Sequence, residues 1–304
     1  TGFYQCGGAY GFRDQLQDVC SYMPLSPKLT RTHIIRCCAS QFEEGDVMHW
    51  WHNMPQCGGG KKGVRTRYSD DLVWLPFAVG SYIAFTNDLS LLQVPVKYLV
   101  APELLPNQKD NYLDAKYTDY KETVYEHCKR ALKRAYQLGE HGLPKIGCGD
   151  WNDGYSKVGI EGKGESVWLA QFLAMTLQQF ARVAKCMNDH EYAEQCIKQA
   201  DLLLDAVDKY CYDQDHYIRA FFDNGEEMGS YQSDECRIDS LTQSFSALAD
   251  MKDKGRIDNA LETAYQALVD HEYGIIKLFT PAYDISTQDP GYVKSYPKGV
   301  RENG

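Results

Sequence analysis

The stretch "ESVWLAQFLAMTLQQFARVAKC", residues 165–186, decides the fold class that the sequence predicts. Its apolar residues recur at every third or fourth position, which is the period of an amphipathic α-helix. A second stretch with the same period, "EYAEQCIKQADLLLDAVDKYC", follows at residues 191–211. The two stretches therefore predict two long helices in the second half of the chain.

The same helical period recurs along most of the chain. Six further segments carry it: residues 13–23, 30–42, 70–86, 121–138, 241–250 and 256–270. The long segments between the helices are rich in glycine and aromatic residues: 45–64, 87–119, 142–164, 212–237 and 275–304. Loops of such length are commonly functional. Residues 91–100 are the best candidate for a short strand. The sequence thus predicts an all-α fold, with helical hairpins arranged in a ring and their loops gathered at one end.

The bulk composition excludes several classes of protein. A chain of 304 residues with 43% hydrophobic and 24% charged residues has the size and composition of a globular protein. Its formal net charge of −10 disfavours nucleic acid and anionic membrane as partners. No apolar run is long enough for a transmembrane helix, and no N-terminal segment has the pattern of a signal peptide. We therefore expect no nucleic-acid partner and no membrane contact from this segment.

The cysteines indicate a reducing compartment. The chain has 11 of them, an odd number at irregular spacing, and several lie within predicted helices, where cysteine acts as a small buried hydrophobe. No CxxC pair occurs, so a zinc site of that type is unsupported. We interpret the cysteines as reduced thiols of a cytoplasmic protein. We expect neither a metal nor a cofactor.

The first candidate site lies in "GGAYGFRDQLQD", residues 7–18. Its glycines allow tight backbone paths, and Arg13 and Asp14 then fall at the start of a helix. An aspartate in the first turn is favoured by the helix dipole, which is a purely structural explanation. The functional explanation is that Arg13 and Asp14 hydrogen-bond sugar hydroxyls, because they offer fixed donors and acceptors. The residues by themselves leave both explanations open.

Two further polar segments lie upstream of a predicted helix. "EGDVMHWWH", residues 44–52, places two tryptophans beside two histidines, and exposed tryptophan rings are platforms for pyranose rings. His49 and His52 could share a metal, but no carboxylate or cysteine motif completes such a site. "GVRTRYSDDLVWLP", residues 63–76, has the pattern of a helix N-terminus. In its extended approach, Arg65 and Arg67 are expected to point to opposite sides, and one of the two could serve an anionic or hydroxylated ligand.

The strongest candidate for chemistry is "KIGCGDWNDG", residues 145–154. Glycines on both sides let the backbone turn sharply around Asp150, Trp151, Asn152 and Asp153. Asp and Asn are ordinary turn residues, but a solvent-facing turn does not need a central tryptophan. A carboxyl group beside an indole is partly desolvated and can stay protonated near neutrality. A general acid for glycosidic cleavage requires that property.

Seven motifs together closely resemble glycoside hydrolase family 94. They appear in the family's order and span nearly the whole chain: "GGAYGFRDQLQD", "EGDVMHWWH", "VRTRYSDDLVWLP", "GDWNDG", "GKGESVWL", "ECRIDS" and "PGYVKSYPKGVRENG". The family contains cellobiose, cellodextrin and chitobiose phosphorylases and the phosphorylase-like domain of cyclic β-1,2-glucan synthases. "ECRIDS" and "GVRENG" look more like the synthase branch.

The resemblance implies an (α/α)6 barrel and inverting phosphorolysis of β-glucosides. Inorganic phosphate, as co-substrate, would attack the anomeric carbon while one aspartic acid protonates the leaving oxygen, giving an α-glycosyl 1-phosphate. The resemblance makes Asp153 the general acid and places Trp151 along the sugar site. It assigns Arg13 and Asp14 to the glycosyl unit of the substrate, with Arg65 as a further candidate. The partners are thus a β-linked gluco-oligosaccharide and phosphate, and a homodimer of the full-length protein is compatible with the resemblance.

The sequence also departs from the family. The family continues past "RENG" with a segment that supplies part of the phosphate site, and it has an N-terminal β-sandwich domain that this chain lacks. The eight predicted helices are fewer than a closed barrel of six hairpins needs. Residues 1–304 are therefore expected to form a single, incomplete catalytic domain, and this polypeptide alone is expected to be inactive or poorly active.

Two other functions compete with phosphorolysis. An inverting hydrolase on the same barrel would need a carboxylate base, and Glu235 or Asp239 could be proposed for it. The simpler explanation of these residues is a capped helix with an internal ion pair. A non-catalytic glucan-processing domain of a large synthase is the third possibility. The linkage stays open among β-1,2, β-1,3 and β-1,4, because acceptor selection depends on loops that differ within the family.

Overall fold

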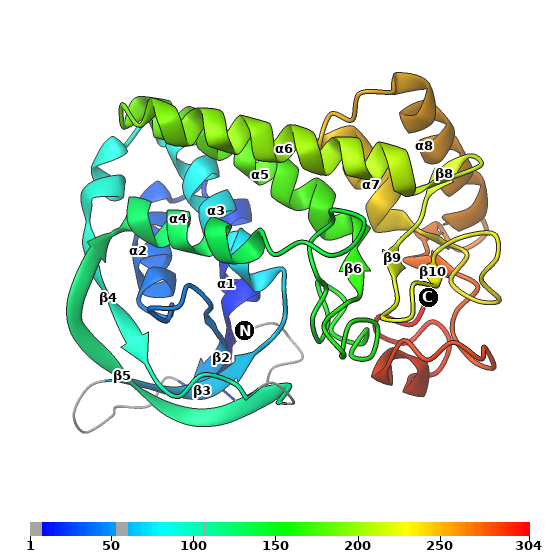
Figure 1. Ribbon diagram of the computed structural model, residues 1–304, viewed down its shortest axis with the longest axis horizontal. Helices are drawn as coiled ribbons and strands as arrows, with labels where there is room; N and C mark the ends of the chain where they lie inside the picture. Colours follow the sequence, from blue (N-terminus) through cyan, green and yellow to red (C-terminus); the bar gives the residue numbers. More distant parts are fainter. Residues whose placement is uncertain (1–7, 53–59, 106–107) are drawn as a thin grey trace. The chain divides into compact units, whose positions relative to one another are not determined.

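The computed structural model describes three stretches of the chain (Figure 1): residues 8–52, 60–105 and 108–304. The chain divides into two compact units. Unit 1 comprises residues 1–136 and 179–194, and unit 2 comprises residues 137–178 and 195–304. Each unit has its own core and its own group of candidate residues. The expectation of a single catalytic domain stays a prediction.

All eight predicted helices are confirmed. They are α1 Phe12–Tyr22, α2 Pro27–Cys38, α3 Asp71–Thr86, α4 Val124–Ala135, α5 Val167–Cys186, α6 His190–Tyr210, α7 Ser240–Leu248 and α8 Lys254–Leu268. Between α5 and α6, Asn188 adopts a left-handed conformation with φ of 59°, which ends the first helix. The carboxylate of Asp189 then accepts the backbone N–H of Tyr192 and caps the second helix.

The predicted all-α class is wrong, and with it the description of the chain as an (α/α)6 barrel. Unit 1 contains a five-stranded antiparallel sheet in the order β1-β2-β3-β5-β4. Its strands are β1 Ala9–Gly11, β2 Met48–His52, β3 Gly60–Thr66, β4 Pro95–Val100 and β5 Asp110–Thr123. Only β4 falls on the strand candidate of the sequence. Helices α1 to α4 lie on one face of this sheet (Figure 1).

Two features kept these strands from being predicted from the sequence: a glycine in β3 and the exposure of side chains in β5. At Gly63 of β3, a Cβ atom would lie only 2.1 Å from the carbonyl oxygen of Trp50. This glycine therefore lets two strands approach, although it looks like a loop residue in the sequence. In β5 most side chains are exposed or half-buried, so the strand lacks the alternation of apolar residues that marks a half-buried strand.

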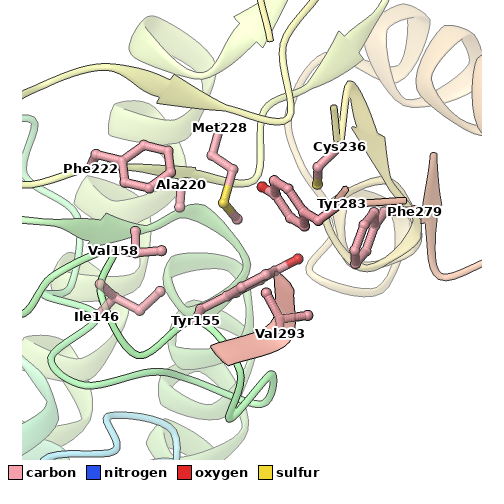
Figure 2. Close-up of a cluster of buried hydrophobic side chains, with 10 residues drawn as sticks. All are labelled: Ile146, Tyr155, Val158, Ala220, Phe222, Met228, Cys236, Phe279, Tyr283 and Val293. Carbon is pink, nitrogen blue, oxygen red and sulfur yellow. The ribbon is translucent and has the colours of Figure 1, made fainter. Parts of the chain in front are cut away.

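Unit 2 folds its long connections over a core of their own. Short strands pair within them: β6 Glu165–Ser166 with β9 Ala220–Phe221 and β10 Glu227–Met228, β7 Tyr212–Asp213 with β8 His216–Tyr217, β11 Ile238–Asp239 with β14 Phe279–Thr280, and β12 Val269–Asp270 with β13 Ile275–Ile276. Figure 2 shows the buried cluster beneath them, which gathers ten residues: Ile146, Tyr155, Val158, Ala220, Phe222, Met228, Cys236, Phe279, Tyr283 and Val293. The predicted loops are thus ordered by burial rather than by helices.

Two predictions concerned the cysteines and membrane-spanning helices. Seven cysteines of the described stretches carry free thiols: Cys20, Cys37, Cys38, Cys128, Cys186, Cys211 and Cys236. Cys6 and Cys57 lie outside the described residues. Across the same stretches, no helix combines the length and the apolar character that crossing a bilayer requires.

A buried lysine lies in the core of unit 1. Lys61 is 9% exposed, and its Nζ lies 4.0 Å from the centroid of the Trp51 ring. The ammonium donates to the carbonyl oxygen of Arg36 at 3.3 Å and to the hydroxyl of Ser40. Burial lowers the pKa of Lys61 to about 7, because the charged form loses its hydration.

This lysine makes the stability of the fold depend on pH. The unfolded chain binds the Lys61 proton up to a pKa near 10.5, whereas the folded chain releases it near 7. Between these values the unfolded state carries more protons, so the free energy of unfolding rises with pH by up to roughly 1.4 kcal/mol per pH unit. We expect Lys61→Met to remove this slope in denaturant titrations between pH 7 and 10. Lys62→Met, at a half-buried neighbour, is the control, and equal slopes in wild type and Lys61→Met would contradict the prediction.

Candidate active site

Arg13 and Asp70 form a buried ion pair in unit 1. Arg13 lies in the first turn of α1, and its Nη1 donates to both carboxylate oxygens of Asp70, at 3.1 and 2.9 Å. Asp70 precedes α3, is fully buried, and also accepts the indole N–H of Trp74 at 2.9 Å. Burial raises the pKa of Asp70 to about 6, although Arg13 opposes this rise. The pair therefore joins the starts of two helices.

The next residue, Asp71, pairs with His49. The Nδ1 of His49 lies 2.7 Å from Oδ2 of Asp71, and the imidazole stacks on Tyr68 with 4.5 Å between ring centroids. The pairing of β2 with β3 shifts register between Met48 and Trp50, so His49 is the extra residue of a β-bulge. Bulges re-aim side chains, which explains how a strand residue reaches the start of α3. The other oxygen of Asp71, Oδ1, is buried without a hydrogen-bond partner among the described residues.

Asp14 and Arg65, both candidates from the sequence, differ in their surroundings. Asp14 is half-buried, and its carboxylate lies against Gly11, where a Cβ atom would be 2.0 Å from Oδ2. Arg65 is only 1% exposed, and all five of its N–H groups find acceptors. These acceptors are the carboxylates of Glu44 and Asp46 and the carbonyl oxygens of residues 101 and 102. The contacts of Arg65 are thus those of a structural ion-pair network, and its part in substrate binding stays a prediction.

In unit 2, the two aspartates of "GDWNDG" have different environments. Asp150 is fully buried and accepts a bidentate pair of hydrogen bonds from Arg219, with Nη1 at 2.7 Å and Nη2 at 2.6 Å. It also accepts the hydroxyl of Ser166 at 2.7 Å and the backbone N–H of Asn152 at 3.1 Å. Asp150 therefore fixes the loop by accepting backbone and side-chain hydrogen bonds.

Asp153 lies at the turn between two buried neighbours. Trp151 and Asp153 are half-buried, whereas Asn152 and Gly154 are buried. The side-chain oxygen of Asn152 accepts the backbone N–H of Gly154 at 3.0 Å, which closes a tight turn around Asp153. The general-acid role of Asp153 and the sugar contact of Trp151 stay predictions.

The C-terminal segment holds this turn in place. The backbone N–H of Val293 donates to the carbonyl oxygen of Gly154 at 3.1 Å. A Cβ atom at Gly154 would lie 2.5 Å from Cβ of Val293, so no larger residue fits. Lys157 and Asp289 form an ion pair at 2.5 Å beside the same contact. Glycine is therefore required at 154 because two segments approach closely.

The two carboxylates considered as a hydrolytic base serve the fold. Glu235 accepts the backbone N–H groups of Asp284, Ile285 and Ser286 at 2.8, 3.0 and 3.0 Å. Burial opposes its ionisation, but these three donors outweigh burial and lower its pKa. Asp239 is 1% exposed, caps α7 through the N–H of Leu241, and lies 3.3 Å from Nε of Arg219. This is the capped helix and ion pair of the simpler explanation.

Three functional-looking groups were missed from the sequence. The pattern of Asp70 and Asp71 predicted only a helix start. Two successive carboxylates were the signal that could have indicated a functional group there. Arg219 was overlooked within "YIRAFF", residues 217–222. A charged residue inside an apolar run must be paired if it is buried, and this rule could have found it. Among the described residues, no group of three or more histidine, cysteine or acidic side chains could hold a metal ion.

The chain belongs to the glycosyl hydrolase 94 superfamily, whose catalytic-domain model matches residues 1–304. It is 44% identical over 305 residues to the cyclic β-(1,2)-glucan synthase NdvB of Rhizobium meliloti (strain 1021), covering 100% of this chain and 11% of that protein. It is 29% identical over 297 residues to the solabiose phosphorylase of Paenibacillus borealis, covering 97% of this chain and 35% of that protein. The chain thus spans a minor part of each relative's length.

A solved structure agrees with the fold. A rhamnosidase from Klebsiella oxytoca with rhamnose bound matches with a TM-score of 0.56 at 13% identity, covering 85% of this chain and 42% of that chain. At such low identity the match is evidence about the fold alone. The family resemblance seen in the sequence is confirmed by the family model.

The close approach at Gly154 gives a test of the loop's packing. We expect Gly154→Ala to lower the free energy of unfolding by about 1–3 kcal/mol, because the new methyl group overlaps Val293. Gly255→Ala in α8 is a matched control, since its Cβ atom would have only a side-chain oxygen of Asp253 within 4 Å, at 3.3 Å. The control should be neutral or stabilising. Urea unfolding of both variants measures the difference, and an unchanged Gly154→Ala would mean that the segments are not clamped there.

Proposed function

We propose that the protein is an enzyme of inverting phosphorolysis, which converts a β-linked gluco-oligosaccharide and phosphate into α-glucose 1-phosphate. The observation that carries the proposal is the division of labour within "GDWNDG". Asp150 is fully buried and bound to Arg219, whereas Asp153 is half-buried at the turn. One carboxyl is therefore committed to structure, and the other is placed on a braced turn. Family membership and a phosphorylase relative support the same reaction.

In the proposed reaction, Asp153 donates its proton to the glycosidic oxygen as the bond from that oxygen to the anomeric carbon breaks. A phosphate oxygen forms the new bond to the anomeric carbon from the opposite face, which inverts its configuration. Asp153 recovers a proton from solvent or from the incoming phosphate. Phosphate takes the place of the activated water, so no second carboxylate is needed as a base.

The proposed sugar contacts follow from chemistry. We assign Arg13, Asp14 and Trp151 to the carbohydrate, since guanidinium and carboxylate groups bind hydroxyls and an indole ring packs on a pyranose. Asp71 joins this set, because its buried Oδ1 has no hydrogen-bond partner among the described residues and can accept a sugar hydroxyl. The reaction as proposed uses no metal and no cofactor.

An inverting hydrolase is less well supported. It needs a carboxylate base for water. The two carboxylates considered for that task are bound within the fold, Glu235 by three backbone N–H groups and Asp239 by a helix cap and Arg219. A role as one part of a cyclic glucan synthase is the second candidate, and the identity to NdvB favours it. In that role the same site would process β-1,2-linked chains.

Substitution of the two aspartates tests the proposal. In the full-length protein, we expect Asp153→Asn to lower kcat for phosphorolysis by about a thousandfold, because the proton donor is lost. Asp150→Asn should act mainly on stability or on KM, with a loss of kcat clearly smaller than that of Asp153→Asn. The measurement is glucose 1-phosphate release from β-1,2-, β-1,3- and β-1,4-linked glucosides. The β-1,2-linked glucosides are tested first.

Omission of phosphate is the matching control for the reaction class. Turnover that continues without phosphate and yields free glucose would mean hydrolysis. Equal losses of kcat in Asp150→Asn and Asp153→Asn would show that the two roles are divided wrongly. Full activity of Asp153→Asn would remove the catalytic assignment altogether.

A further inference from the structure

Arg219 is a fully buried cation that the proposed reaction does not itself use. Its guanidinium is 0% exposed and binds both oxygens of Asp150, and its Nη1 lies 3.3 Å from the hydroxyl of Ser166. Nε lies 3.3 Å from Asp239 but makes no hydrogen bond, so that contact is an ion pair only. Burying an ion pair rarely gains stability over a well-packed apolar core. A role beyond stability is therefore worth seeking.

The backbone of Arg219 is held rigidly. Its N–H donates to the carbonyl oxygen of Met228 at 2.7 Å, and its carbonyl oxygen accepts the N–H of Val167 at 3.2 Å. Gly229, at φ of 83°, lets the chain pass close by, since a Cβ atom there would lie 2.7 Å from the backbone nitrogen of Arg219. The guanidinium thus projects from a fixed point beside the sheet of β6, β9 and β10.

A chain of hydrogen bonds leads from this guanidinium to the turn that carries Asp153. Arg219 fixes the carboxylate of Asp150, whose Oδ1 accepts the backbone N–H of Asn152. The side-chain oxygen of Asn152 in turn accepts the backbone N–H of Gly154. Through Asp150 and Asn152, Arg219 therefore fixes the positions of the backbone N–H groups of Asn152 and Gly154, on either side of Asp153.

Ser166 closes the chain from the other side. Its hydroxyl donates to Oδ2 of Asp150 at 2.7 Å, and its oxygen accepts the N–H of Leu169 at 3.0 Å at the start of α5. The carboxylate of Asp150 is thus held between a helix start and a sheet. The carboxylate of Asp150 therefore cannot shift or rotate unless the start of α5 or the sheet moves with it.

We propose that Arg219 is a positioning residue for the proton donor Asp153, acting through Asp150 and Asn152 to fix the orientation of the catalytic turn. This inference rests on the proposed function. A guanidinium can bind two carboxylate oxygens in one plane, whereas an ammonium binds as a point charge. Arg219→Lys therefore keeps the charge and loses the bidentate geometry.

The expected result separates positioning from a general loss of structure. On a gluco-oligosaccharide, whose leaving group needs a proton, Arg219→Lys should lower kcat by about a hundredfold with little change in KM. On 2,4-dinitrophenyl β-glucoside, whose leaving group departs without a proton, the loss should shrink to a few-fold. Arg256→Lys on the half-exposed face of α8 is the matched control and should keep both activities.

A second measurement does not depend on turnover. Hydrogen exchange at the amides of Asn152 and Gly154 should be roughly tenfold faster in Arg219→Lys than in wild type, because the turn loses its anchor. The amides of β9 should be unchanged. If Arg219→Lys does not fold, Asp150→Asn removes the same anchor without a change of side-chain size, and it should accelerate the same two amides.

The outcomes distinguish this inference from the proposed function. Equal losses on both glucosides, or unchanged exchange at both amides, would overturn the positioning role while phosphorolysis by wild type stands. If the full-length wild type turns over neither glucoside with phosphate, the proposed function fails and the catalytic part of the inference fails with it. Faster exchange alone would then still identify Arg219 as the anchor of the turn.

Discussion

The bidentate ion pair between Arg219 and Asp150 joins two segments that are 69 residues apart in the chain, with N–O distances of 2.7 and 2.6 Å. Burial opposes the charge of Arg219, but Asp150 and Asp239 outweigh it and raise the pKa of the guanidinium. Removing either partner would leave a buried charge without compensation, at a cost of about 3–5 kcal/mol. The connections of unit 2 are long and have little regular structure, so this pair and the buried apolar cluster fix their course.

Unit 1 uses the same device with different elements. Arg13 and Asp70 are also buried, and they join the starts of α1 and α3. In both units an arginine holds one aspartate inside the fold, and a second acidic residue lies close to it in the sequence: Asp71 in unit 1 and Asp153 in unit 2. Two residues of one type thus have different surroundings within each unit.

The helices could be predicted from the sequence because their signal is local. Apolar residues at helical spacing recur within each segment, and the caps lie directly beside them, as at Asp189 and Asp253. The sheet of unit 1 could not be predicted in the same way. Its strands are exposed on one side or depend on Gly63, whose function is visible only when β2 lies against it. The spacing of apolar residues reveals a strand only when one face of the strand is buried, and β5 has no consistently buried face.

The candidate site shows the same limit. "GDWNDG" could be singled out because its glycines, tryptophan and aspartates are contiguous. The partner of Asp150 could not be located, since a single arginine in "YIRAFF" carries no spacing that points to residue 150. His49 likewise reaches Asp71 only through a bulge, and a one-residue shift of register is invisible without the neighbouring strand. The ion pairs from Arg13 to Asp70 and from Arg219 to Asp150 join residues 57 and 69 positions apart, so a local sequence pattern cannot show which carboxylate of each pair is bound within the fold.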